Sequence, residues 1–410
     1  MLSGQRITLV STFAPADCGI ASYSQYLAQA LLDEDPGVRL AVVTTSGGPG
    51  RTIGRLEIVP GGSMEADYPA TIAQAVTDTR PDIVHIQHEY GIFGADERFP
   101  CLLSMLTELG LPVVVTMHTV HTNLSVDLGC GWTKGFSMQG VGIEPYQHVI
   151  GQLANVVVVH HDQAIRRPLI RQGLAGHDVV VIPHGTLCVD QPAVLAEARA
   201  QIPSGRPLLV APGYLRPSKN VEMLIEAFAA IADDYPDAVL WIGGHLRPDA
   251  TAARTYLDGC REKADRYGVL NRLIVAERPI SEAAMSGILA AADLVLCVYD
   301  EDTRSVSGIA HRAIGAGAVV VVSRRPKFQE FAEVCDELLV DPDRPAELAR
   351  LVRRLLDDDA FRGSVRRSLR GLAEETAWPL VARRHLDTYA RLGATMSRLE
   401  PVGVGAARGD

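Results

Sequence analysis

The sequence LLVAPGYLRPSKNVEMLIEAFAAIA occupies residues 208–232 and combines an apolar run, a basic loop and an amphipathic segment. Residues 208–210 have the continuous apolar character of a buried strand, and apolar residues then recur at helical spacing from Val221 to Phe228. This pattern predicts a strand, a loop and a helix in succession.

The loop GYLRPSKN places two cations beside the amino end of that helix. Gly213 permits a tight turn, and Arg216 and Lys219 supply the positive charges. Free backbone N–H groups and the helix dipole favour an anion at such a position. Two cations suit a diphosphate better than a single carboxylate. A solvated basic loop is the alternative, and this stretch alone does not distinguish the two.

The same plan occurs near the start of the chain. Residues 6–10 form an apolar run, the loop STFAPADCGIAS contains Gly19, and apolar positions then recur at helical spacing from Tyr23 to Leu31. Two such beginnings, about two hundred residues apart, predict two Rossmann-like halves.

The whole chain alternates apolar runs with amphipathic segments. Its 410 residues exceed one ordinary domain, and 47% are hydrophobic. Continuous Val and Ile runs between helices predict an α/β fold, with doubly wound parallel sheets covered on both faces. We expect an amino-terminal domain over 1–187, a second domain over 188–376, a terminal helix over 377–395 and a disordered tail over 396–410.

Composition excludes several other classes of protein. The net charge is −10 without a basic block, which argues against a nucleic-acid-binding groove. Seven cysteines without a CxxC pair are typical of a reduced, cytoplasmic protein. The chain shows neither a signal-peptide core nor a spanning segment, so we expect a cytoplasmic protein that associates with a membrane at most peripherally. GxGxxG, P-loop and GxSxG motifs are missing.

Polar residues follow two strands predicted in the first half. His88, Glu89 and Tyr90 come directly after one apolar run, and His118 follows the next. Parallel strands bring such residues to one edge of a sheet, where a polyhydroxylated ligand can bind. His118 is either a hydrogen-bond partner of the substrate or a satisfied core histidine, and its spacing alone favours the core. Because HExxH spacing is missing, we expect no metal.

A second anion-binding position is predicted in the second half. Arg304 and Ser305 lead into Ser307-Gly308, which open an amphipathic segment and therefore offer free N–H groups. Residues 300–302, Asp-Glu-Asp, have the form of a metal-binding DxD, but acidic loop tips are common.

Taken together, these motifs resemble the family 4 glycosyltransferases, which use nucleotide sugars and have the GT-B fold. The similarity covers nearly the whole chain. The loop IQHEYGIFG looks like one bacterial branch. The other stretches that carry the resemblance are GIASYSQYLAQAL, VTMHT, VIPHG, GYLRPSKNVEMLIEAF, RAIGAGAVVVVS and AWPLVARRHLDTY.

The resemblance implies two Rossmann-like domains facing across a cleft, the first holding the acceptor and the second the donor. It implies transfer of a sugar from a nucleotide-sugar donor to a hydroxyl acceptor, with retention at the anomeric carbon. A UDP-sugar is favoured as donor and GDP-mannose comes next. Neither a metal nor another cofactor is expected, and the protein would be a monomer or homodimer.

The resemblance also assigns roles to individual residues. Lys219, with Arg216, would neutralise the leaving diphosphate, and His118 would contact the donor sugar near the reacting centre. Arg278 and Pro279 fall where the nucleobase is held. The full donor-binding set is Gly19, Gly213, Arg278, Pro279, Arg304, Ser305, Ser307 and Gly308, and the acceptor set is His88, Glu89 and Tyr90.

The chain departs from the family pattern at two places. Tyr214 stands where the family has its diphosphate arginine, so Arg216 would substitute for it. Arg304 and Arg312 stand where the family has paired glutamates, the first of which holds the donor sugar. These departures leave open a second function, that of a GT-B-shaped sugar- or nucleotide-binding or regulatory protein without transfer activity.

Overall fold

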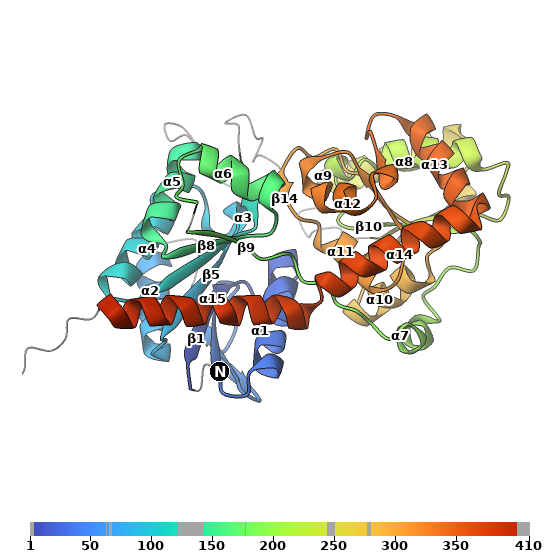
Figure 1. Ribbon diagram of the computed structural model, residues 1–410. Helices are drawn as coiled ribbons and strands as arrows, with labels where there is room; N and C mark the ends of the chain where they lie inside the picture. Colours follow the sequence, from blue (N-terminus) through green and yellow to red (C-terminus); the bar gives the residue numbers. More distant parts are fainter. Residues whose placement is uncertain are drawn as a thin grey trace, which may run out of the picture. The chain divides into compact units, whose positions relative to one another are not determined.

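The chain forms two compact α/β units in a computed structural model (Figure 1). The structure describes residues 4–62, 64, 68–121, 143–176, 178–243, 251–276 and 280–399. One unit comprises Met1–Pro183 and Trp378–Asp410, and the other comprises His184–Ala377. In the described part of the chain, helices of sufficient length all lack the continuous apolar stretch that crossing a membrane requires.

The first unit contains an eight-stranded sheet in the order β3-β4-β2-β1-β5-β6-β8-β9. Neighbouring strands are parallel, except for the antiparallel edge pair β3 and β4. The strands are β1 (Arg6–Ser11), β2 (Arg39–Thr44), β3 (Arg51–Ile53), β4 (Leu56–Pro60), β5 (Ile83–His88), β6 (Val113–Met117), β8 (Val156–Val159) and β9 (Val179–Val181); a short strand, β7 (Thr119–Val120), follows β6.

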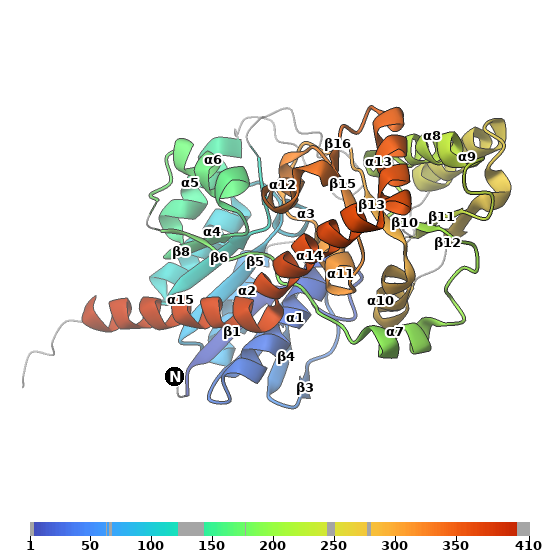
Figure 2. The same cartoon turned by 45° about the vertical axis from the view of Figure 1, so that its right-hand side comes forward.

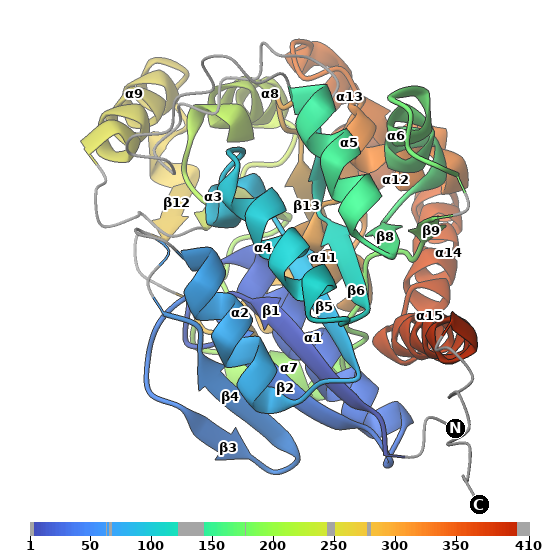
Figure 3. The ribbon, with the colours of Figure 1, turned by 90° about the vertical axis from the view of Figure 1, so that its left-hand side faces the viewer.

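Helices cover both faces of this sheet, and Figure 3 shows α2 and α4 in front of its strands. The helices of the unit are α1 (Gly19–Glu34), α2 (Tyr68–Thr79), α3 (Tyr90–Phe93), α4 (Arg98–Glu108), α5 (Ile143–Leu153), α6 (Arg167–Arg171) and α15 (Trp378–Leu399).

The second unit contains a six-stranded parallel sheet in the order β12-β11-β10-β13-β15-β16. Its strands are β10 (Leu208–Pro212), β11 (Val239–Gly243), β12 (Leu273–Ala276), β13 (Leu294–Cys297), β15 (Val320–Ser323) and β16 (Leu339–Val340); β14 (Arg304–Ser305) lies outside this sheet. Its helices are α7 (Gln191–Ala198), α8 (Val221–Ile231), α9 (Thr251–Arg266), α10 (Glu282–Ala291), α11 (Gly308–Gly315), α12 (Gln329–Val334), α13 (Pro345–Asp357) and α14 (Asp359–Glu375).

The predicted α/β fold with two parallel sheets is confirmed. Residues 208–232 form β10, a 3-10 turn at Pro217–Lys219 and α8, in the predicted order. All five residues of β10 are buried, because the strand lies between β11 and β13 and is covered on both faces.

The strand order marks where each unit should bind a ligand. In the second unit the order reverses between β10 and β13, and in the first it reverses between β1 and β5. Open parallel sheets bind ligands outside the carboxyl ends of the two strands at such a point. The loops that follow these four strands are therefore the places to examine.

Helix α15 packs on the first unit, beside α1 (Figures 1 and 2). The Trp378 ring lies 5.1 Å from that of Tyr23, and the Tyr389 hydroxyl lies 2.6 Å from Nδ1 of His85. The helix continues to Leu399, so residues 396–399 are helical rather than part of the predicted tail. The remainder of that tail, residues 400–410, lies outside the described residues.

The division between the units falls after Pro183, four residues before the predicted boundary after Leu187. Thr186 explains the difference, because its contacts are within the second unit. Its backbone N–H donates to the carbonyl of Thr376 at 2.7 Å, and its hydroxyl lies 2.6 Å from Nδ1 of His311.

Candidate functional site

The loop after β10 begins with a strained turn that brings backbone close to a lysine. Gly213 has a φ of 131°, and its N–H donates to the carbonyl of Gly243 at 2.7 Å. A Cβ added at Gly213 would lie 3.6 Å from Cε of Lys219. Only glycine adopts this backbone conformation without strain, so the loop can turn and place Lys219 over the end of the strand.

Three cations converge on one carboxylate at this point. Arg216 and Lys327 both form ion pairs with Glu301, and Nζ of Lys219 lies 3.8 Å from Oε1 of the same residue. The hydroxyl of Ser218 donates to that oxygen at 2.7 Å. We call Arg216, Lys219, Lys327 and Glu301 the cation cluster.

The members of the cation cluster come from three separate loops. Arg216 and Lys219 follow β10, Glu301 follows β13, and Lys327 belongs to a 3-10 turn, Pro326–Phe328, after β15. The side chains of Lys327 and Glu301 are 12% and 8% exposed. The cluster therefore lies at the carboxyl edge of adjacent parallel strands, with Glu301 and the two lysines largely shielded from water and Arg216 39% exposed.

Burial and neighbouring charges shift the pKa values of Glu301 and Lys219. Burial disfavours an ionised Glu301, but Lys327, Lys219 and Arg216 outweigh burial and hold the pKa of Glu301 well below its usual range. Burial lowers the pKa of Lys219 to about 7, against the attraction of Glu301. The Lys219 ammonium lies 3.5 Å from the centre of the Tyr299 ring, whose π face favours its charged form.

The cation cluster holds more positive than negative charge. Three cations face a single carboxylate, so positive charge is in excess even with Lys219 neutral, and the excess is larger when Lys219 is protonated. The Nε–H of Arg216 is buried and finds no acceptor among the described residues. A diphosphate would supply several acceptor oxygens and the missing negative charge.

The acidic loop tip does not form a metal site. The carboxylate of Asp300 pairs with Arg325 at 2.6 Å, and Glu301 is held by the cations. Across the ranges given above, no group of three or more His, Cys, Asp or Glu side chains could hold a metal ion.

The second predicted anion position lies at the start of α11. Ser307 is the amino-terminal cap of this helix, and its hydroxyl accepts from the N–H of Ala310 at 3.4 Å. A Cβ added at Gly308 would lie 3.2 Å from Nε2 of His184, so only glycine fits comfortably. The His184 ring stacks on His311 at 4.8 Å, and Nε2 of His311 lies 3.0 Å from Glu330.

The two arginines that replace the family's glutamates have different surroundings. Arg312 lies on α11 and pairs with Glu282 of α10 at 3.0 Å, so it joins two helices. Arg304 is half-buried in β14, next to the buried Ser305. Arg278 and Pro279, which were predicted to hold the nucleobase, lie outside the described residues.

Gly19 is the first residue of α1, in the loop after β1. It is exposed, and nothing lies within 4 Å of a Cβ added there. The thiol of Cys18 caps the helix by accepting from the N–H of Ala21 at 3.3 Å. The helix therefore begins at an open surface, as a phosphate-binding amino terminus requires.

His118 follows β6 and belongs to a buried chain of polar groups. Nδ1 of His160 lies 3.0 Å from the carbonyl of Ile182, and because a carbonyl only accepts, His160 donates there. The amide oxygen of Gln87 lies 2.9 Å from Nε2 of His118 and can only accept, so Nε2–H of His118 donates to it, and Nδ1 of His118 lies 3.1 Å from Nε2 of His160. Only 7% of His118 is exposed and both ring nitrogens have partners, as the core interpretation requires, and contact of this ring with a substrate stays a prediction.

His88, Glu89 and Tyr90 follow β5 and were all predicted to contact an acceptor, but they differ in how far they are buried. His88 is fully buried, and burial lowers its pKa to about 3. Tyr90 is also buried, and its hydroxyl donates to Gln147 at 3.0 Å. Glu89 is half-buried, caps α3 and accepts from the Thr119 hydroxyl at 2.8 Å. Of the three, only Glu89 is partly exposed, and the contact of each with an acceptor stays a prediction.

Sequence reasoning missed Lys327 as a site residue and treated Glu301 only as part of a DxD. It also did not single out Gln87. The one signal for Lys327 is its place in SRRPKF, directly after the apolar run at 319–322, which is the kind of position that carries ligand contacts in a parallel sheet.

Comparison with known proteins identifies the two units. A family model described as "Glycosyl transferases group 1" matches residues 206–358, and one described as "Glycosyl transferase 4-like domain" matches residues 18–185. The chain is 24% identical over 294 residues to the phosphatidyl-myo-inositol mannosyltransferase of Mycobacterium tuberculosis (strain CDC 1551 / Oshkosh), covering 70% of each chain. It is 26% identical over 367 residues to the D-inositol 3-phosphate glycosyltransferase of Arthrobacter sp. (strain FB24), covering 87% of this chain and 80% of that protein.

Solved structures show the same fold. The UDP-forming α,α-trehalose-phosphate synthase of Burkholderia xenovorans superimposes with a TM-score of 0.73, over 95% of this chain and 99% of that chain, at 14% identity. Together with the family matches, this likeness confirms the GT-B resemblance that the motifs indicated.

Proposed function

Because the chain belongs to the group 1, 4-like glycosyltransferases, nucleotide-sugar-dependent enzymes of the GT-B fold, we propose that it transfers a sugar with retention to a hydroxyl acceptor. The observation that carries this proposal is the convergence of Arg216, Lys219 and Lys327 at the carboxyl ends of β10, β13 and β15. In this reaction the bond from the anomeric carbon to the diphosphate breaks, and a bond to the acceptor oxygen forms.

The cation cluster would stabilise the charge that develops as the diphosphate leaves. Negative charge builds on the leaving oxygen while positive charge builds on the sugar, so fixed cations beside the diphosphate lower the barrier. A diphosphate oxygen can accept the proton released by the acceptor hydroxyl. Arg216 and Lys327 supply the charge that the arginine replaced by Tyr214 supplies in the family, and Lys219 supplies the second cation.

Helix amino termini would complete phosphate and sugar binding. The first N–H groups of α11, after Ser307 and Gly308, and those of α1, at Gly19, point outward from their helices and can donate to anionic oxygens. We retain Ser305 and Arg304, which precede α11, as donor-binding residues.

The acceptor site would lie in the first unit. Part of the His118 ring, which belongs to the same unit, would face the donor sugar. Glu89 is the acceptor-binding residue we propose there, because His88 and Tyr90 are enclosed. The chain from Gln87 through His118 to His160 would hold the His118 ring in one orientation toward the donor sugar.

We propose a UDP-sugar as the donor, with GDP-mannose next. Isothermal titration calorimetry with UDP-, GDP- and ADP-sugars tests this choice, followed by a turnover assay against hydroxyl acceptors. Relatives named for inositol compounds make inositol phosphates a sensible part of the acceptor panel. If no donor binds at millimolar concentration, the transferase proposal fails.

The alternative is a binding or regulatory protein of the same fold without transfer activity. Arg312 favours it, because this arginine pairs with Glu282 at a position where the family has a glutamate. Donor binding without turnover in the whole acceptor panel would support this alternative, whereas turnover with any acceptor would exclude it.

Lys327 should act in donor binding, although no motif marks it. Lys327→Gln is expected to weaken UDP binding about tenfold, because one charge-assisted hydrogen bond to a phosphate oxygen is lost. Arg325→Gln is the matched control, since it removes a charge from the same turn but from a guanidinium paired with the exposed Asp300. Calorimetry measures the affinity of both variants for UDP. Equal losses of affinity would contradict a direct contact between Lys327 and a phosphate oxygen.

A further inference from the structure

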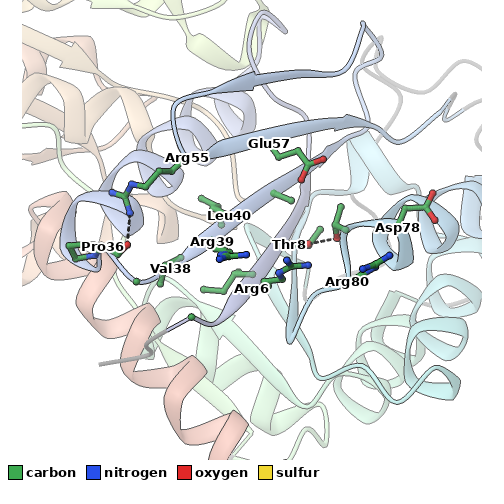
Figure 4. Close-up of a pocket in the computed structure, with 15 residues that line it drawn as sticks. Arg6, Thr8, Pro36, Val38, Arg39, Leu40, Arg55, Glu57, Asp78 and Arg80 are labelled. Atoms are coloured by element: carbon green, nitrogen blue, oxygen red, sulfur yellow. Dashed lines mark hydrogen bonds between the residues drawn. The ribbon is translucent and has the colours of Figure 1, made fainter.

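A hollow of about 650 Å³ lies at the amino ends of β1, β2 and β4, in the first unit. Figure 4 shows it, with side chains from these strands and from the end of α2 around it. The loops with Gly19 and His118 follow the carboxyl ends of β1 and β6, so they belong to the opposite edge of the same sheet. Nothing in the proposed sugar transfer uses this hollow.

The paired strands β1 and β2 form the floor and one wall of the hollow. Arg6 of β1 is the register partner of Arg39 of β2, so both side chains project from the same face of the sheet. Two residues further on, Thr8 is the partner of Ala41. These are small side chains, and the Thr8 hydroxyl lies 2.6 Å from that of Thr79, at the end of α2. Space therefore remains beside the two arginines.

A third arginine comes from the turn after α2. Arg80 has a φ of 51°, an uncommon backbone conformation for a residue with a Cβ, and it lines the hollow opposite the strands. Figure 4 shows Arg6, Arg39 and Arg80 around the same space. Within the described ranges, these three side chains make neither a hydrogen bond nor an ion pair.

A fourth arginine in the hollow has a structural role. Arg55 donates to the carbonyls of Leu32 and Pro36, the latter at 3.1 Å, and so satisfies backbone groups at the end of α1.

Two carboxylates also line the hollow. Asp78 accepts from Gln74 at 2.8 Å, and Glu57, on β4, has no arginine within 4 Å among the residues that the structure describes.

We propose that this arginine pocket binds the phosphate group of a hydroxylated phosphate monoester. Like charges on register partners repel each other, so Arg6 and Arg39 side by side are unfavourable unless an anion lies between them. Guanidinium groups match phosphate oxygens with paired hydrogen bonds, and three of them suit a dianion. The volume is that of a site for a small metabolite, and Glu57 can accept hydrogen bonds from its hydroxyl groups.

The same chemistry, a phosphate monoester on a hydroxylated ring, occurs in a soluble sugar phosphate and in the headgroup of phosphatidylinositol 4-phosphate. The experiment therefore has two arms, calorimetry with glucose 6-phosphate and flotation with vesicles that contain phosphatidylinositol 4-phosphate. We expect binding in one arm, with an affinity that falls at least about tenfold in Arg6→Gln/Arg39→Gln. Whichever probe binds identifies the source of the phosphate group.

Three further variants make the result specific. Arg171→Gln removes an exposed charge from α6 and should bind like the wild type. Lys219→Ala alters the cation cluster and should also leave this binding unchanged, which separates the arginine pocket from the proposed donor site. Arg39→Lys keeps the charge but loses the paired geometry, and should weaken binding by less than the double variant.

A second measurement locates the bound ligand. Phenylglyoxal modifies exposed arginines, and the probe that binds should protect Arg39 and Arg80 but not Arg171, as mapped by mass spectrometry. The proposal is overturned if neither probe binds the wild-type protein, if the double variant retains wild-type affinity while its thermal unfolding is unchanged, or if Arg39 is not protected.

Discussion

Lys219→Ala is expected to lower kcat/KM for sugar transfer by about a hundred- to a thousandfold, the effect of removing one preorganised charge from a leaving group. Lys219 lies over the Tyr299 ring and within 3.8 Å of Glu301, in the loop that follows β10. The substitution removes an ammonium whose burial is unfavourable, so the fold should persist. Steady-state kinetics with the donor found by calorimetry, together with circular dichroism, measures both effects. Wild-type turnover in a folded variant would contradict the diphosphate assignment.

Lys219→Arg is the matched control. Its affinity for UDP-glucose is compared with that of the wild type as a function of pH. Because the pKa of Lys219 is lowered to about 7, the free protein loses this charge as the pH rises from 6 to 8. An anionic donor binds the protonated form better, so the affinity for UDP-glucose should fall over that interval. Arginine stays charged, so the Lys219→Arg variant should bind with an affinity that does not change with pH. A flat profile for the wild type would show that Lys219 does not face the diphosphate.

Glu301→Gln is expected to lower the free energy of unfolding by about 3 kcal/mol, since removal of one partner leaves buried charges uncompensated. Glu301 is 8% exposed and faces three cations, of which Lys327 and Lys219 are also largely buried. Added pyrophosphate should restore much of this stability, because it would neutralise the same cations. Urea unfolding with and without pyrophosphate measures the loss and the recovery.

Asp300→Asn is the control for that experiment. Asp300 is the neighbouring carboxylate, but it is exposed and pairs with Arg325, so its loss should change stability by less than about 1 kcal/mol. If pyrophosphate stabilises the Glu301→Gln variant no more than it stabilises the wild type, the cation cluster is a structural ion-pair network rather than an anion site.

The fold was predictable because its signals are local. In the first unit, the apolar run at 6–10, the glycine loop and the amphipathic segment from Tyr23 became β1 and α1. The end of the terminal helix was less well predicted. It continues to Leu399 because residues 396–399 keep helical character and contain neither glycine nor proline to end it.

The site was predictable only where its residues share one loop. Gly213, Arg216 and Lys219 belong to a single turn, so their spacing alone placed two cations beside one helix. The burial of His88 and Tyr90, which were predicted to contact a ligand, has the opposite origin. Polarity and position after a strand suggested exposure, but the rings pack among Phe93, Tyr146 and other aromatic groups that helices supply.

By itself, the sequence determined the α/β class, two parallel sheets and a basic loop after the strand at 208–212, because strand period, helix period and turn residues act over a few positions. The tertiary structure determined which charges meet. Arg216 and Glu301 are 85 positions apart, and Lys327 lies 26 positions beyond Glu301. Parallel strands bring these loops to one edge of the sheet, and burial there makes Glu301 the partner of all three cations. Strand pairing likewise placed Arg6 beside Arg39, which no local pattern in the sequence could show.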